Sequence, residues 1–354
     1  MRTSGSSRPI GLRSAAWLLA AWLAACTVTP PAAPSGLICP YAPWYGHAYR
    51  HGAVPTREAQ RLILAWKASR REAQAAVSGA MLVFGGGVDG IGVTSGVPRV
   101  YLVFYGSQWA SGGDPAGAAP YLQRLFQGIG TGRELWSGTM TQYCDGPSVL
   151  KGASSCAPAN TPHVGYPQGG ALAGVWFDTD APSPASATPE QLAQEAVRAA
   201  QHFGNTSAAA NRYVQYLIVS PSGTHPDGFG LAGSNFCAWH DFTPSADGDI
   251  AYSNMPYVSD AGSSCGTSFV NAGAAGALDG FSIVGGHEYA ETLTDQNPPG
   301  GWTTAAGEET GDECAWIGSG QGASADVTMG NGAYAMQSTW SNDTGQCEIA
   351  HTLL

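Results

Sequence analysis

The sequence predicts an α/β (α+β) fold in which a mixed β-sheet is packed with helices and the loops are stapled by disulfides. Short apolar runs typical of strands alternate along the chain with segments typical of helices, which favours a sheet covered by helices over an all-β sandwich. The 354 residues include 49 Gly and 23 Pro, which indicates long loops between short elements. A chain of this length is sufficient for one large core.

Two kinds of local signal locate the elements. Residues 100–104 (VYLVF) form a continuous apolar run, which is typical of a strand buried on both faces. Thr188 is followed by Pro and has Gln191 three positions later, the features of a helix N-terminus. By such criteria we expect helices at residues 56–77, 121–128 and 188–203, and strands at residues 81–84, 99–105, 135–143 and 213–220.

The first residues have the features of an export signal. Three Arg precede a short apolar segment at residues 15–23, which ends in Leu-Ala-Ala-Cys26 and resembles a bacterial lipobox. We therefore expect a lipoprotein signal peptide at residues 1–25, lipidation of Cys26 and a flexible Pro- and Ala-rich tether at residues 26–36. The leader also suits ordinary cleavage, so the protein is expected to be exported, either as a lipoprotein of the bacterial cell envelope or as a secreted protein.

Beyond the tether, the chain divides into an N-terminal helical region at residues 37–97 and a larger domain at residues 98–354. The formal net charge is −11, and removal of the three leader arginines makes the exported chain more acidic still. An acidic surface repels phosphate backbones, so nucleic acid is excluded as a partner, and the membrane is expected to be reached only through the lipid anchor.

Seven cysteines follow Cys26, and an oxidising compartment would pair most of them. No Cys-x-x-Cys pair is present, which argues against a four-cysteine zinc site. Cys39 is the odd one out, and sequence alone leaves the connectivity of the others open. Their order favours three local disulfides: Cys144 with Cys156, Cys237 with Cys265, and Cys314 with Cys347.

The most informative motif is Gly-His287-Glu288-Tyr-Ala-Glu291. On a helix, His287 and Glu291 lie one turn apart on the same face, and Asp295 follows one turn later. Zinc proteases carry His-Glu-x-x-His, in which two imidazoles bind zinc and the Glu is the general base. Here Glu291 replaces the second His, and a carboxylate oxygen binds zinc at a similar distance. The motif predicts a zincin-like metal helix with His287 and Glu291 as ligands and Glu288 as the base that activates water.

Further ligands have to come from outside this helix. An acidic cluster at residues 308–313 follows a Pro- and Gly-rich turn and offers Asp312, or Glu309 in its place. His240 is a second candidate, either as a metal ligand or as a catalytic group that stabilises an oxyanion. The alternative is that His240 is a structural histidine, packed in the core and hydrogen-bonded to backbone. His225 is a weaker candidate for the same functional roles.

Zinc is the expected cofactor, and calcium is the rival cation. Calcium is a rival because the segment is rich in Gly and in oxygen ligands, and a calcium ion would make the region structural. Those ligands are Asp295, Asn297, Glu308, Glu309 and Asp312. A serine nucleophile is disfavoured: residues 262–266 match Gly-x-Ser-x-Gly, but no apolar strand precedes them and Cys265 is a predicted disulfide partner.

Several segments together resemble the EXORDIUM / phosphate-induced protein 1 family of the plant apoplast, which has secreted bacterial relatives. The resemblance covers residues 98–350, although the plant pattern carries an additional Cys near Cys237. It implies an exported protein, and it joins the His287 helix and the acidic loop into one unit. The similar segments are residues 100–109, 121–143, 213–220, 236–240, 286–291 and 311–314.

The sequence therefore predicts an exported, lipid-anchored, metal-dependent hydrolase of the zinc peptidase or amidase type. Its expected substrates are extracytoplasmic protein, peptide or cell-wall material. The alternative is a non-catalytic surface protein that binds glycan or protein through its 11 Trp and 14 Tyr, with a structural calcium or acidic site. The two readings differ at Glu288, which only the hydrolase requires.

Overall fold

A computed structural model of the chain describes residues 38–47, 50–73, 81–156 and 160–354. The predicted signal peptide, the lipidation site Cys26 and the tether lie outside the described residues. Within the described ranges, every helix is too short or too polar to span a bilayer.

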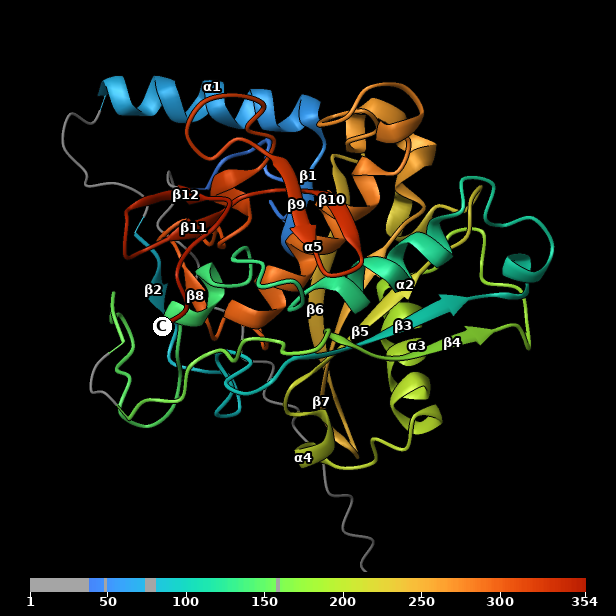
Figure 1. Ribbon diagram of the computed structural model, residues 1–354, viewed down its shortest axis with the longest axis horizontal. Helices are drawn as coiled ribbons and strands as arrows, with labels where there is room; N and C mark the ends of the chain where they lie inside the picture. The colour runs from blue at the N-terminus through green and yellow to red at the C-terminus, as the bar shows by residue number, and fades with distance from the viewer. Residues whose placement is uncertain (1–37, 48–49, 74–80, 157–159) are drawn as a thin grey trace, which may run out of the picture. The chain divides into compact units, whose positions relative to one another are not determined.

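The centre of the fold is a six-stranded mixed sheet with the strand order β1-β6-β7-β5-β3-β4 (Figure 1). The pairs β4–β3, β3–β5 and β5–β7 are parallel, whereas β6 and β1 are added antiparallel at one edge. The strands are β1 (His51–Pro55), β3 (Arg99–Tyr105), β4 (Leu172–Asp178), β5 (Val214–Val219), β6 (Phe236–Ser245) and β7 (Gly248–Met255). This arrangement confirms the predicted mixed sheet.

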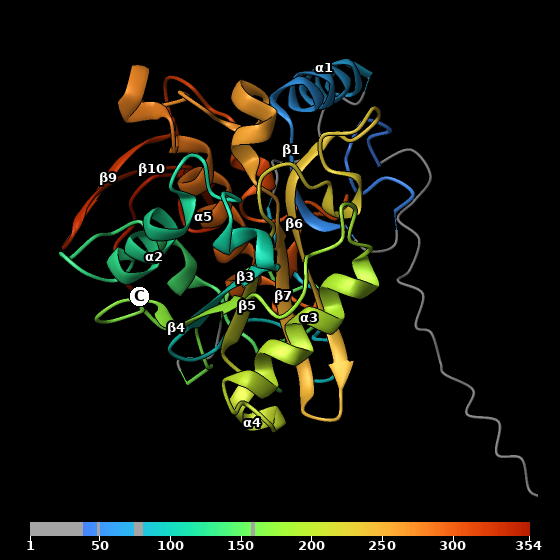
Figure 2. The ribbon, with the colours of Figure 1, turned by 90° about the vertical axis from the view of Figure 1, so that its right-hand side faces the viewer.

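Helices cover both faces of the sheet, as Figure 2 shows. Helices α2 (Ala118–Gly128) and α5 (Asp279–Thr294) lie on one face, and α3 (Pro189–His202) with the short α4 (Ala208–Asn211) lies on the other. Every residue of β5 is therefore buried, which explains why its sequence is continuously apolar rather than alternating.

Local capping fixes two of the helix starts. Thr188 accepts a hydrogen bond from the Gln191 amide through its side chain, and the Gln191 side chain accepts one from the Thr188 amide, so the predicted capping box is present. Helix α1 (Arg57–Ala73) begins after Thr56, whose hydroxyl accepts a bond from the Ala59 amide. The predicted continuation of α1 beyond residue 73 lies outside the described residues.

Helix α5 differs from the other helices because all of its residues are buried. It is enclosed by β6, β1, α2 and the strand β10 (Gly332–Met336). Gly286 permits the approach of β10, because a Cβ at this position would lie 2.6 Å from the Met336 side chain. A helix surrounded in this way has to direct its polar side chains into the protein, where each needs a partner.

Outside the central sheet and its helices, the described residues form loops, short 3-10 turns and three two-stranded ribbons, β2–β8, β9–β10 and β11–β12. Their strands are β2 (Val83–Phe84), β8 (Trp302–Thr303), β9 (Ala325–Met329), β10 (Gly332–Met336), β11 (Thr339–Ser341) and β12 (Gln346–Glu348). The N-terminal region predicted as helical therefore contains β1 and β2 as well as α1.

The predicted strand at residues 135–143 is wrong. Successive turns occupy this segment, and a 3-10 helix spans Thr139–Gln142. Gly138 lies against the backbone carbonyl of His351, and the Glu134 carboxylate accepts a hydrogen bond from the Ser137 amide, so the chain is coiled rather than extended. Residues 136–143 are all buried, so the large apolar side chains here belong to the core and not to a sheet.

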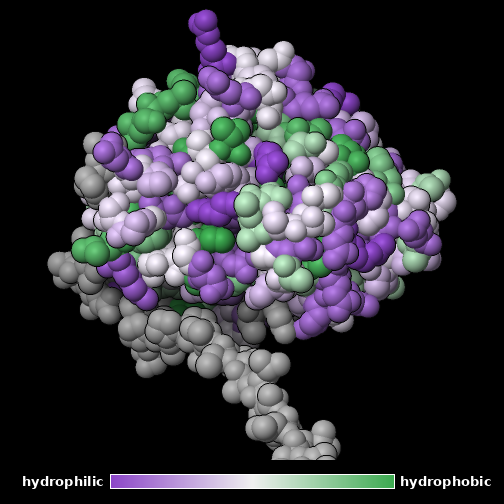
Figure 3. All heavy atoms as spheres, turned by 90° about the horizontal axis from the view of Figure 1, so that it is seen from below, coloured by the Kyte–Doolittle hydropathy of each residue, from purple (hydrophilic) through white to green (hydrophobic). Residues whose placement is uncertain are grey.

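Three disulfides join Cys144 to Cys156, Cys237 to Cys265, and Cys314 to Cys347, the pairs favoured by chain order. Cys39 is a buried free thiol. Such disulfides fit an extracytoplasmic protein. The face drawn in Figure 3 is mainly hydrophilic, and its apolar side chains are scattered rather than gathered into one patch.

Candidate metal centre

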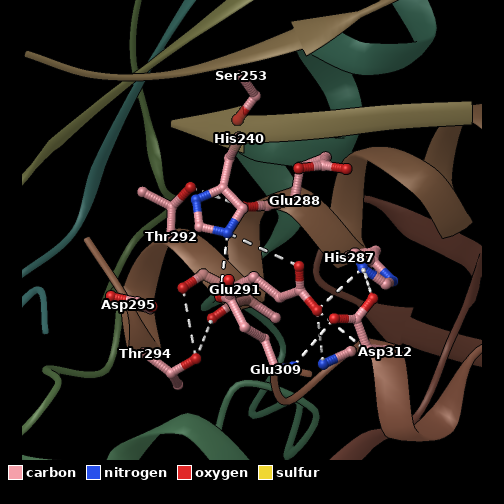
Figure 4. A network of polar contacts seen from close by, with 12 residues as sticks. His240, Ser253, His287, Glu288, Glu291, Thr292, Thr294, Asp295, Glu309 and Asp312 are labelled. Carbon is pink, nitrogen blue, oxygen red and sulfur yellow. Dashed lines mark hydrogen bonds and ion pairs between the residues drawn. The ribbon is translucent and has the colours of Figure 1, made fainter. Parts of the chain in front are cut away.

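Three parts of the chain meet at one buried polar cluster (Figure 4). Helix α5 supplies His287, Glu288 and Glu291, and β6 supplies His240. The loop after β8 supplies Glu309 and Asp312. All six side chains are buried, with at most 5% of any residue exposed. Polar groups removed from water in this way require partners, and the contacts within the cluster show which of them have one.

The first group consists of His287, Glu291 and Asp312, as predicted for the ligands. His287 Nε2 lies 3.0 Å from Glu291 Oε1 and 3.8 Å from Asp312 Oδ1. The short contact lacks hydrogen-bond geometry, so Nε2 is a buried nitrogen without a hydrogen-bond partner, and Asp312 Oδ1 is likewise unpartnered. Donor atoms that converge without bonding to each other are the arrangement that a cation requires.

Gln337, just after β10, orients the His287 ring. The Gln337 amide nitrogen donates to the Gly311 carbonyl at 2.7 Å, so its oxygen faces His287 Nδ1 at 3.3 Å. An amide oxygen only accepts hydrogen bonds, so Nδ1 carries the ring proton and the Nε2 lone pair points at the carboxylates. Fixing the tautomer through the distal nitrogen is how proteins prepare histidine for a metal.

Glu291 also organises the acidic loop. Its Oε1 accepts hydrogen bonds from the amides of Gly311 and Asp312, at 3.0 and 2.9 Å. Asp312 in turn accepts a bond from the Glu309 amide. The hydrogen bonds to Glu291 thus hold the acidic loop against the helix, and the disulfide at Cys314 holds the C-terminal end of the loop.

A second group consists of His240, Glu291 and Glu309. His240 Nε2 lies 3.0 Å from Glu309 Oε2 and 3.7 Å from Glu291 Oε2. Its Nε2 therefore faces two carboxylates, which disfavours the predicted oxyanion role for His240 and the packed, backbone-bonded alternative. Chain spacing gave Glu309 only as a substitute for Asp312, whereas the structure uses both residues in different groups.

The cluster holds four carboxylates, and among the described residues no lysine or arginine forms an ion pair with any of them. Burial, reinforced by neighbouring carboxylates, raises the pKa of Glu288, Glu309 and Asp312 well above the usual range. Burial also lowers the pKa of His240 well below its ordinary value, with the nearby His51 and His287 acting in the same direction. A bound cation would offset this excess of negative charge.

Glu288 stands apart from the contacts of its neighbours (Figure 4). Both of its carboxylate oxygens are buried. Burial, followed by the charges of Glu291 and Asp312, raises its pKa, and a hydrogen bond from the Val54 amide opposes the shift. A carboxylate whose pKa is raised is suited to accept and release protons.

Other sequence candidates lie outside the centre. Asp295 follows the end of α5, its carboxylate accepts a bond from the Gly301 amide, and it belongs to neither group, although its charge raises the pKa of Glu309. His225 is bonded to the Phe229 carbonyl, the packed arrangement. The oxygen ligands expected for calcium are dispersed among the described residues, since Asn297 contacts Asp249 and Glu308 contacts Lys67. A third group beside His163 uses the sulfurs of the Cys144–Cys156 disulfide, which are bonded to each other.

Strand β1 closes the centre. It pairs antiparallel with β6, placing His51 opposite His240. Gly52 follows at a φ of +48°, and a Cβ there would lie 2.2 Å from Glu291 Oε2 and 2.3 Å from His240 Nε2. A residue with any side chain would collide with the ligands, so Gly52 is needed for this contact. Sequence reasoning missed the strand, whose only signal is a short apolar stretch after His51.

Comparison with family models, curated proteins and solved structures finds no match to this chain. The resemblance to the EXORDIUM family therefore stays a prediction.

Proposed function

We propose that the protein is an exported, lipid-anchored, metal-dependent hydrolase of the zinc peptidase or amidase type, acting on extracytoplasmic protein, peptide or cell-wall material. The observation that carries the proposal is the convergence of His287 Nε2, Glu291 Oε1 and Asp312 Oδ1 in a buried position, with the imidazole tautomer set by Gln337. Each ligand group contains an imidazole, which favours zinc or a similar transition metal over calcium.

The residues divide the chemical work. His287, Glu291 and Asp312 would hold the cation, which when bound would lower the pKa of a coordinated water and polarise a carbonyl group. Glu288 follows His287 in the helix, its carboxylate is buried, and it would accept the proton from water. Its raised pKa then allows it to pass that proton to the leaving group.

The test is Glu288→Gln in the full-length exported protein. We expect zinc content, measured by plasma mass spectrometry, to stay at the wild-type value while hydrolysis of labelled casein or cell-wall peptide falls about 10²- to 10⁴-fold. Glu195→Gln is the matched control, because Glu195 is also buried but lies on α3, outside the centre. Equal activity in wild type and Glu288→Gln, with metal bound in both, would refute the hydrolase.

A second candidate is a surface protein that uses the cation only for stability. The complete burial of the centre favours it, because a substrate could reach the ligands only after part of the fold moves. The predicted aromatic platforms do not support glycan binding, since many of the large rings, among them Trp136, Trp239 and Trp302, are buried. This candidate predicts that Glu288→Gln leaves every binding and hydrolytic property unchanged.

The stability gained from the metal should grow with pH. In protein freed of metal by a chelator, the pKa values of Glu309 and Asp312 are raised in the folded state. The folded state therefore holds protons that the unfolded state has released. The resulting penalty is absent below the unfolded pKa of about 4 and increases as pH rises above it. We expect the Tm difference between zinc-loaded and chelated protein, measured by calorimetry, to widen from pH 5 to pH 8. A constant difference would contradict this assignment.

A further inference from the structure

We propose that the centre binds two cations, bridged by the carboxylate of Glu291. The first is held by His287 and Asp312, as above, and the second by His240 and Glu309. This inference rests on the proposed metal-dependent function and extends it, since one cation would suffice for the water activation described there. Two cations bridged by a carboxylate form a cocatalytic centre that can orient both the attacking and the leaving oxygen.

The geometry of Glu291 is the main argument. Its Oε1 lies 3.0 Å from His287 Nε2, whereas its Oε2 lies 3.7 Å from His240 Nε2. The two oxygens thus face two different imidazoles, and Figure 4 shows the carboxylate between them. A ligand for one cation needs only one of these oxygens. The second oxygen is buried and has no hydrogen-bond partner.

The second group lies directly under strand β1. The Gly52 backbone is so close that a Cβ there would lie 2.2 Å from Glu291 Oε2 and 2.3 Å from His240 Nε2, so only glycine keeps a side chain off these two atoms. Glu309 Oε2 shares a hydrogen bond with His240 Nε2 at 3.0 Å, and a cation in place of the shared proton would have His240, Glu309 and Glu291 as its ligands.

The charge of the cluster also fits two cations. Glu288, Glu291, Glu309 and Asp312 are buried together, and no lysine or arginine of the described residues pairs with them. The buried Asp295 adds to this negative charge, because it acts on Glu309. A second divalent cation would offset more of this charge than one cation can, and such an offset lowers the cost of burial in a medium of low dielectric constant.

The two positions should differ in affinity. His287 donates through Nδ1 to Gln337, whereas Nδ1 of His240 is buried without a partner. A partner on the distal nitrogen makes an imidazole a better ligand, by about 10- to 100-fold in metal affinity. We therefore expect the His287 position to fill first and the His240 position to fill second.

The experiment measures bound metal in the full-length protein after equilibration with zinc and removal of free metal. Wild type should hold two zinc ions per chain, while Glu309→Gln and Asp312→Asn should each hold one. Glu195→Gln, a buried substitution on α3, should keep two. His240→Gln replaces Glu309→Gln if that variant does not fold, as judged by circular dichroism.

A spectroscopic measurement tests the bridge itself. In wild type loaded with Mn²⁺, one equivalent should give the signal of an isolated ion, and the second should broaden it through magnetic coupling. Two bound ions without coupling would overturn the bridge. One ion that Asp312→Asn loses and Glu309→Gln keeps would overturn the second position and leave the proposed function standing. Wild type without bound metal would overturn both.

Discussion

Glu291→Gln should remove the metal from the centre. The variant should then be less stable than wild type in zinc but more stable than wild type in chelator. In zinc, wild type should be the more stable by about 4 kcal/mol when zinc exceeds its Kd 1,000-fold, because only wild type gains binding energy. In chelator at neutral pH, the variant should be the more stable, since the charge of Glu291 raises the pKa of Glu288, Glu309 and Asp312. Calorimetry of both proteins in both buffers measures the four Tm values.

The substitution is suited to this test because glutamine keeps the shape of the side chain. Its amide oxygen can still accept the bonds from Gly311 and Asp312 that hold the acidic loop. A variant that melts below wild type in chelator as well as in zinc would show that Glu291 acts through the loop alone. Glu195→Gln, outside the centre, should show no reversal.

Removal of the Cys314–Cys347 disulfide should destabilise the protein and release metal together. The bridge closes a loop with a sequence separation of 33 residues, for which the loss of chain entropy in the unfolded state predicts about 4 kcal/mol. Cys314 lies two residues after Asp312, so the loop end that carries this ligand would lose its covalent anchor. Denaturant unfolding of the Cys314→Ser/Cys347→Ser variant, with metal analysis of the folded fraction, measures both effects.

Cys144→Ser/Cys156→Ser is the matched control for that variant. This disulfide spans 12 residues and should contribute about 3 kcal/mol, but neither cysteine adjoins a ligand of the two groups. The control should therefore lose stability and keep its zinc. If it loses as much zinc as the Cys314 variant, metal loss reflects general destabilisation rather than the anchoring of Asp312.

The elements that the sequence predicts well are those whose local signals agree with their burial. The run at residues 100–104 is apolar because helices cover both of its faces, and the cap at Thr188 needs only contacts within four residues. His287 and Glu291 could be paired for a similar reason, since helix geometry alone places them one turn apart. Asp312 could be predicted as a ligand because a turn returns the chain to the helix soon after α5 ends.

The missed features depend on contacts between distant segments. Residues 135–143 contain large apolar side chains of the kind found in strands, yet Gly138 lies against the His351 carbonyl and the segment coils. Asp295 continues the ligand face only if α5 continues, and the helix ends at Thr294. The pairing of His240 with Glu309, and the strand laid over both, join positions far apart in the chain. Local periodicity carries no information on such contacts.

Strand β1 is one of the two edge strands of the sheet, so it can leave without separating two other strands. Its departure would bare a row of backbone amides and carbonyls on β6, directly beside His240. An extended polypeptide is the class of molecule that binds such a row. Strand β1 would have to leave the edge of β6 before a peptide could bind there, so β1 would compete with every such peptide for the same site.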